Sequence, residues 1–255
     1  MTFSLENFEV FLIILVRTTG FIFTAPFFSL GNVPVRVKTG FAIFLTAILF
    51  YSAPYQQAEY EGIIGYFVIV VSEALAGAIM GLFANIAYYI INFAGQLLDM
   101  EIGFSMVTQF DPINNVPSTI TANLYGNLVL LIMMITNMHH YFIRAIVDSF
   151  QVIGIGEVKI DPDMYHIMIQ FITDYFIIGF RIVLPVYASM LVVNTILAIL
   201  TKIAPQMNMF VIGIQLKIVV GLIVLILMMG LLPSVADFIF NEMVMLLKTS
   251  IQYLK

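Results

Sequence analysis

Hydrophobic and polar positions divide the chain into long apolar segments separated by short polar or proline-containing breaks. The apolar segments cover residues 10–30, 39–54, 63–95, 120–136, 141–152, 164–200, 210–232 and 235–247. A helix that crosses the hydrocarbon core of a membrane needs about 20 residues, so 39–54 is short for a crossing and 164–200 is too long for one. The pattern predicts an all-α membrane protein built from interrupted helical hairpins.

Prolines predict where the later segments are interrupted. Pro185 should kink or break the segment 164–200, because proline removes a helical hydrogen bond and its ring clashes with the preceding turn. Residues 201–208 form a second break, and Pro233 should end the segment 210–232. These interruptions favour hairpins over simple crossings.

A stripe of small and polar residues follows one face of the segment 63–95. Glu73, Gly77, Gly81 and Asn85 recur every four residues, and the stripe continues to Asp99. Small residues at this spacing let another backbone approach closely, and a row of carboxylates and amides is unfavourable against lipid. We therefore expect this face to meet other helices or water. Packing within a monomeric bundle and packing against partner subunits around a conduit both fit the stripe.

The segment 103–117, GFSMVTQFDPINNVP, lies between two long apolar blocks. Its two prolines and its Asn-Asn pair predict turns and extended backbone in its second half. Its first half is as apolar as a protein core. Such a segment is either a loop outside the membrane, or a non-helical segment at membrane depth that is buried in protein or lines an aqueous cavity.

Composition decides the class of protein and excludes several functions. The 255 residues are 62% hydrophobic and 10% charged, and the mean hydropathy is +1.05, which indicates an integral membrane protein. The net charge of −5 argues against binding to nucleic acid. The absence of cysteine excludes disulfides and thiolate metal sites, and no phosphate-binding motif is present.

Charged residues within apolar segments suggest alternative functions. Arg17, Asp174 and Arg181 are expected to be buried charges, which in a membrane need a protein or aqueous partner. With Glu73 they could instead form the substrate or proton sites of a secondary transporter with helices broken at prolines. A membrane-embedded enzyme centred on the histidine pair at 139–140 and on Asp148 is a further alternative.

Several short motifs follow one another along the chain: RTTG at 17–20, PFF at 26–28, VPVRVK at 33–38, EALAG at 73–77, GFS at 103–105, DP at 111–112, DSF at 148–150, LPV at 184–186 and APQMNMF at 204–210. In this order and spacing they resemble the motifs of the FliR/SctT family of type III secretion export-gate proteins. The most specific is the last, a break that contains Pro205, Gln206, Met207, Asn208 and Met209.

The resemblance implies one subunit of a helical, ring-like export-gate assembly in the bacterial inner membrane, at the flagellar basal body. Its partners would be FliP, FliQ and FlhB, its substrates would be unfolded secreted proteins, and it would need no cofactor and have no enzymatic activity. Residues 1–180 would form a FliP-like part and residues 181–255 a FliQ-like part. A subunit of a virulence injectisome is the alternative within the family.

The resemblance also implies that the segment 103–117 contributes to a plug that closes the pore. The plug residues would be Gly103, Phe104, Ser105, Met106, Val107, Phe110, Asp111 and Pro112. Its apolar members are assigned to the seal, because an apolar constriction can stop ions by excluding water. The stripe from Glu73 to Asn85 would then face neighbouring subunits or the lumen.

Overall fold

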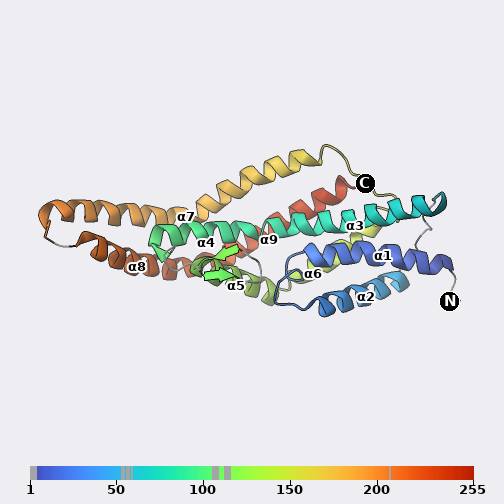
Figure 1. The fold of residues 1–255 in the computed structure, drawn as a ribbon, viewed down its shortest axis with the longest axis horizontal. Helices are drawn as coiled ribbons and strands as arrows, with labels where there is room; N and C mark the ends of the chain where they lie inside the picture. The colour runs from blue at the N-terminus through green and yellow to red at the C-terminus, as the bar shows by residue number, and fades with distance from the viewer. Residues whose placement is uncertain are drawn as a thin grey trace. The chain divides into compact units, whose positions relative to one another are not determined.

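The computed structural model describes residues 5–52, 55, 58, 60–104, 109–111, 116–206 and 208–255 (Figure 1). At 5–6, 109–111, 116–118 and 209–210 it describes the backbone without the side chain. The chain divides into two compact units that interleave along the sequence. One comprises Met1–Tyr88, Met134–Gln170 and Ile239–Lys255, and the other comprises Tyr89–Met133 and Phe171–Phe238.

The first unit is organised around two helices that pack closely, α1 (Leu5–Thr24) and α3 (Gly62–Ile86). The helix α2 (Val35–Ser52) covers another side of α1. It begins four residues earlier than expected because the carbonyl of Pro34 accepts the first helical bonds from Val37 and Lys38. The segment was expected to be short for a crossing, and with this earlier start its 18 residues reach the lower limit for one.

The remaining part of the first unit consists of α6 (His139–Val152), the start of α7 (Met164–Ile203) and most of α9 (Leu232–Gln252). Backbone bonds join the connection after α6 to the C-terminus: Lys159 donates to the carbonyl of Leu254, and Asp161 donates to that of Tyr253. The chain end is therefore fixed to a connection about 90 residues earlier in the sequence.

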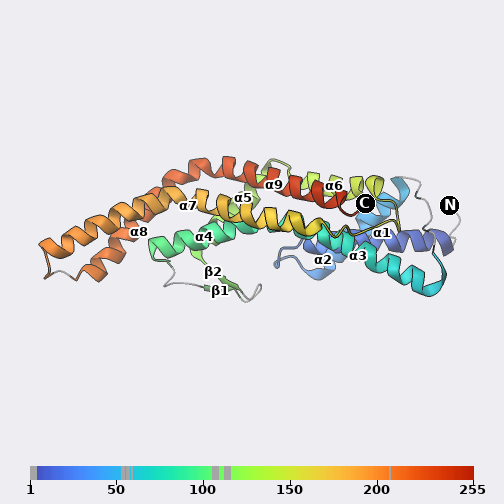
Figure 2. The same ribbon diagram turned by 90° about the horizontal axis from the view of Figure 1, so that it is seen from above.

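The second unit contains α4 (Tyr89–Ile102), α5 (Ile120–Ile135) and α8 (Met209–Met228) together with most of α7. Helices α7 and α8 run side by side after the turn between them (Figure 1). Two short strands, β1 (Gln109–Asp111) and β2 (Val116–Ser118), pair antiparallel between α4 and α5, as Figure 2 shows. Their register pairs Gln109 with Ser118, Phe110 with Pro117 and Asp111 with Val116.

Three predicted boundaries differ from the structure. The segment 63–95 is not one helix: it turns at 87–88, where the N–H of Tyr88 bonds to the carbonyl of Asn85 and tightens the last turn of α3. Pro185 does not break α7, which continues as helix for 40 residues. The segment 210–232 ends before Pro233: α8 stops at Met228, a short 3₁₀ turn follows, and Pro233 lies in the first turn of α9, where proline is tolerated.

The described residues contain five helical segments that are long and apolar enough to cross a membrane. The bent pair formed by α5 and α6 brings this number to six if it acts as one span. The predicted all-α membrane fold is therefore confirmed, with the two short strands as its exception.

Candidate functional site

Two sets of predicted site residues have a defined geometry, and each lies within one compact unit. The first is the centre of the α1–α3 interface, which contains Arg17 and part of the stripe on α3. The second is the base of the segment 103–117, where α4 ends and α5 begins.

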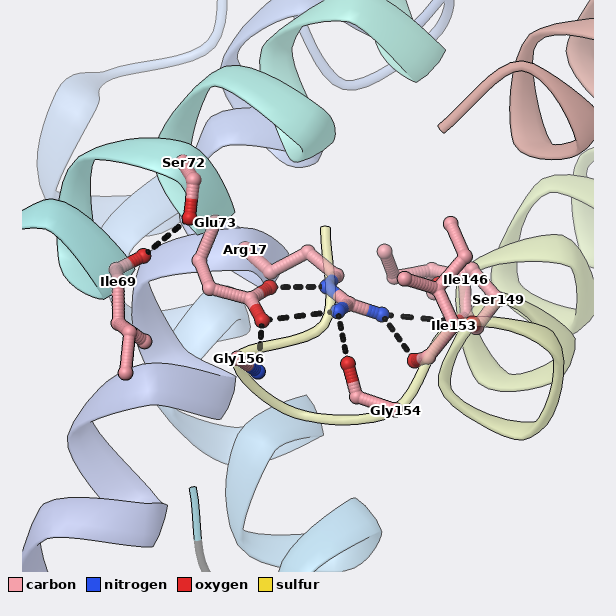
Figure 3. A network of polar contacts seen from close by, with 9 residues as sticks. All are labelled: Arg17, Ile69, Ser72, Glu73, Ile146, Ser149, Ile153, Gly154 and Gly156. Atoms are coloured by element: carbon pink, nitrogen blue, oxygen red, sulfur yellow. Dashed lines mark hydrogen bonds and ion pairs between the residues drawn. The ribbon is translucent and has the colours of Figure 1, made fainter. Parts of the chain in front are cut away.

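Arg17 and Glu73 form a buried ion pair between α1 and α3 (Figure 3). Both side chains are 0% exposed. Nε of Arg17 donates to one oxygen of Glu73, and Nη2 donates to the other at 3.0 Å. This two-point geometry matches the planar guanidinium to the planar carboxylate, which is the strongest form of such a pair.

Backbone groups in the last turn of α6 and in the connection after it satisfy the remaining hydrogen-bonding capacity of the pair (Figure 3). Arg17 donates to the carbonyls of Ser149, Ile153 and Gly154 at 3.2–3.3 Å. Glu73 accepts the N–H of Gly156 at 2.8 Å. We call these six residues the Arg17 network. It joins α1, α3 and the end of α6, and because its charges are paired and bonded, their burial is tolerated.

Aromatic rings cover the cation of the Arg17 network. The guanidinium carbon of Arg17 lies 4.2 Å from the ring centroid of Phe150, a cation–π distance. Tyr55 packs edge-on against the same ring at 6.0 Å. Burial raises the pKa of Tyr55, and the positive charge of Arg17 opposes that shift. The phenol therefore stays neutral at physiological pH.

The stripe on α3 packs against α1 of the same chain. A Cβ atom added to Gly77 would lie 2.9 Å from the carbonyl carbon of Arg17, and one added to Gly81 would lie 2.8 Å from the backbone nitrogen of Ala25. Asn85 is half-buried and donates to the hydroxyl of Ser29 at 3.3 Å. The residues from Glu73 to Gly81 thus use the intramolecular alternative that the sequence left open.

Asp99 forms hydrogen bonds on both sides of the segment 103–117, with Gly103 and with Thr121. Its backbone carbonyl accepts the N–H of Gly103 at 3.0 Å, which closes the end of α4. Its buried carboxylate accepts the N–H of Thr121 at 3.0 Å and also the hydroxyl of Thr121. The carboxylate therefore caps α5 from another helix and also lies near the positive end of the α5 dipole, which favours a negative charge.

Two further features shape this base. Gly103 has φ +96, a conformation that other residues rarely adopt. Gly95 on α4 lies so close to α5 that an added Cβ would be 2.6 Å from the backbone nitrogen of Ala122. The helices that flank the segment are therefore in direct backbone contact just outside it.

The structure describes the predicted plug residues only in part. Gly103 and Phe104 are half-buried at the end of α4. Phe110 and Asp111 lie in β1, where only the backbone is described. Ser105, Met106, Val107 and Pro112 lie outside the described residues. The non-helical backbone predicted for the second half is confirmed where the strands define it, and the sealing role stays a prediction.

The remaining predicted residues lie on or after α7. Asp174 is half-buried and Arg181 is exposed, and no ion pair joins them. Pro205, Gln206 and Asn208 are exposed in the turn before α8. Met207 lies outside the described residues, and Met209 begins α8 without a described side chain.

The sequence did not reveal the hydrogen-bond partners of Arg17 and Glu73, or those of Asp99. Thr121 and the backbone groups from Ser149 to Gly156 were not singled out, because each acts through a contact with a residue distant in sequence. One local signal was present: Thr119 and Thr121 at the start of α5 are typical of a helix N-terminus.

Comparison with known proteins gives a consistent family. Residues 8–243 match the family "Bacterial export proteins, family 1". The flagellar biosynthetic protein FliR of Bacillus subtilis (strain 168) is 32% identical over 244 residues, which cover 94% of each chain. FliR of Escherichia coli (strain K12) is 29% identical over 235 residues, covering 91% of this chain and 89% of the relative. FliR of Aquifex aeolicus (strain VF5) is 26% identical over 255 residues, covering 97% of each. The chain therefore belongs to family 1 of the bacterial export proteins, the family that contains these FliR proteins.

Proposed function

We propose that the chain is a non-enzymatic subunit of the flagellar type III protein export gate. With FliP and FliQ it would form a plugged pore through which unfolded flagellar subunits cross the bacterial inner membrane, with FlhB as a further partner. The family and the names of the relatives support an export role, and those names support the flagellar system over the injectisome.

The observation that carries the plug proposal is the backbone between α4 and α5. In a unit otherwise made of helices, the chain leaves the helical conformation at Gly103 and forms a two-stranded ladder before α5. Non-helical backbone at membrane depth is tolerated only where it is buried in protein or lines an aqueous cavity. A segment closing a pore meets that condition, because it is surrounded by protein on its sides and by water at its ends.

The base of the segment supports a plug that is held in place while closed. Asp99 bonds to Gly103 at the start of the segment and to Thr121 in the first turn of α5, so it holds the start of α5 beside the end of α4. The apolar residues between them, Phe104, Met106, Val107 and Phe110, would supply the water-excluding seal. Opening would displace the segment while α4 and α5 remain in contact.

We further propose the division into a FliP-like part, residues 1–180, and a FliQ-like part, residues 181–255. The turn at Pro205 and Gln206, between the long helices α7 and α8, supports a helical hairpin in the second part. Helix α8 exposes large apolar side chains along its length, including Val219, Ile226 and Leu227. Such a surface suits contact with neighbouring subunits or with lipid.

The test of the plug is deletion of residues 103–112 in cells that carry the complete export apparatus. We expect the complex to assemble and the membrane to leak ions, measured as membrane depolarisation and slowed growth. The control is Met100→Ser, because Met100 is 66% exposed on α4 just before the segment and is not assigned to the seal. A deletion variant as ion-tight as the parent would show that the plug assignment is wrong.

A second arm covers the case in which the deletion prevents assembly. The triple variant Phe104→Ser, Val107→Ser and Phe110→Ser keeps the length of the segment and removes its apolar surface. It should assemble and leak, and a tight assembled triple variant contradicts the seal. Affinity purification of the tagged chain should recover FliP and FliQ, and recovery of a solitary chain would contradict the subunit proposal itself.

A further inference from the structure

The second unit contains a cavity of about 290 Å³. Its floor is formed by buried apolar side chains of α4 and α5, including Ile91, Ala94 and Val129. Its rim is formed by α7 and by the junction between α8 and α9, where Leu231 and Phe238 are 54% and 44% exposed. The cavity is therefore apolar inside and accessible from the surface of the unit.

The polar side chains that line this cavity are those of Tyr125, Arg181 and Ser234, and they differ in exposure and in hydrogen bonding. The hydroxyl of Tyr125 donates to the carbonyl of Leu225 at 3.3 Å, so its proton is used within the protein. Arg181 and Ser234 line the cavity and are exposed. Across the described ranges, no carboxylate lies within ion-pair distance of the Arg181 guanidinium. The cavity thus combines an apolar interior with one unpaired cation at its rim.

Arg181 lies near the middle of α7, a 40-residue apolar helix that is long enough to cross a membrane. An arginine in such a position requires an anionic or aqueous partner. Its planar fork of donors binds phosphate oxygens at two points.

We propose that this cavity binds an anionic phospholipid, with one acyl chain inside the cavity and the phosphate on Arg181. The hydroxyl of Ser234 can donate to the same phosphate. The chemistry of the lining favours this ligand, because a phospholipid carries on one molecule an apolar chain that suits the interior and an anionic phosphate that suits the guanidinium at the rim. The proposal does not depend on the pore or on the plug.

Photolabelling tests the proposal on the full chain, purified with the subunits that accompany it and placed in phosphatidylcholine vesicles. The probe is phosphatidylglycerol with a diazirine near the end of one acyl chain, and the comparison probe is phosphatidylcholine with the same chain. We expect phosphatidylglycerol to label peptides containing Ile91–Ala94 or 228–238, and phosphatidylcholine to label them weakly.

Variants separate recognition of the lipid head group from occupancy of the cavity by the acyl chain. Arg181→Gln should reduce labelling by phosphatidylglycerol about fivefold, the loss expected for one exposed charge-assisted contact. Arg181→Lys keeps the charge but loses the two-point geometry, so its labelling should lie between that of the parent and that of Arg181→Gln. Ala94→Leu fills the floor and should reduce labelling although Arg181 is present. Arg144→Gln, at an exposed arginine on α6, is the matched control and should have no effect.

Several results would overturn the proposal. Equal labelling by the two probes would show that no anion is recognised, and equal labelling of the parent and Arg181→Gln would show that Arg181 is not the contact. Cross-linking of the cavity residues to a partner polypeptide in place of lipid would assign the cavity to a protein interface. If Arg181→Gln does not fold, competition by unlabelled phosphatidylglycerol against unlabelled phosphatidylcholine on the parent chain decides the same question.

Discussion

The backbone of Gly77 on α3 lies directly against the backbone of Arg17 on α1. A Cβ at residue 77 would lie 2.9 Å from the carbonyl carbon of Arg17 and 3.0 Å from the nitrogen of Phe21. The Arg17 network depends on this proximity, because the guanidinium must reach Glu73 one turn earlier on α3. Close helix packing and the buried ion pair are therefore two parts of one arrangement.

Gly77→Leu should prevent α1 and α3 from packing at this distance. The obstacle is backbone, which cannot rotate away, so we expect destabilisation of more than about 3 kcal/mol, at the upper end for overpacked cores. The measurement is the thermal unfolding midpoint and the yield of monodisperse full chain in detergent. A variant that unfolds at the same temperature as the parent would contradict the close contact.

Gly40 and Gly103 form a matched pair of substitutions. Among the residues that the structure describes, neither has a neighbour within 4 Å of an added Cβ. Gly40 lies inside α2, so Gly40→Ala should stabilise the chain by up to about 1 kcal/mol through helix propensity. Gly103 has φ +96, so Gly103→Ala should destabilise it by about 1–2 kcal/mol. Unfolding midpoints that shift in the same direction would contradict the backbone conformation assigned to Gly103.

The positions of most helices could be predicted from the sequence, whereas some of their ends could not. The apolar segment 120–136 predicts α5, which covers Ile120–Ile135, because Pro117 precedes it and polar residues follow it from Asn137. The turn at 87–88 has no proline or glycine, so nothing local separates α3 from α4. Pro185 was expected to kink or break its segment, and the helix continues through it without a break.

For the site residues, too, features encoded locally in the sequence could be predicted, whereas the partners distant in sequence could not. The small residues at 77 and 81 predict a close helix contact, and the structure has one. The identity of the partner helix was not predictable, because Arg17 and Glu73 are separated by 56 residues and each could have paired elsewhere. The carboxylate of Asp99 was assigned to the continuing stripe, yet it caps a helix that begins after the central segment.

Asp99→Ala should weaken the base of the central segment. The substitution leaves the N–H and the hydroxyl of Thr121 without their buried acceptor, which costs about 1–3 kcal/mol. In the assembled complex we expect faster hydrogen exchange at Thr121, whereas the Gly103 N–H keeps its backbone acceptor. Asp99→Asn keeps one acceptor oxygen and should have a smaller effect. Equal exchange in Asp99→Ala and the parent would show that the carboxylate does not hold α5.

Glu73→Ala should be among the most damaging single substitutions. It leaves the Arg17 cation buried without its carboxylate, and breaking a buried pair in this way costs about 3–5 kcal/mol. Unfolding of the purified full chain in detergent measures the loss. Arg144→Gln provides the control, since Arg144 is exposed on α6 and should change stability little. A Glu73→Ala chain as stable as this control would contradict the network.

Replacing both charges of the Arg17 network tests whether it is more than an ion pair. Apolar replacement of an isolated buried pair is often neutral or stabilising. Here the double variant Arg17→Met, Glu73→Leu also removes the donors of three backbone carbonyls and the acceptor of the Gly156 N–H. We therefore expect it to remain strongly destabilised and the connection after α6 to exchange its amide hydrogens faster. A double variant with the stability of the parent would show that the backbone contacts contribute little, and that the ion pair alone determines the cost of Glu73→Ala.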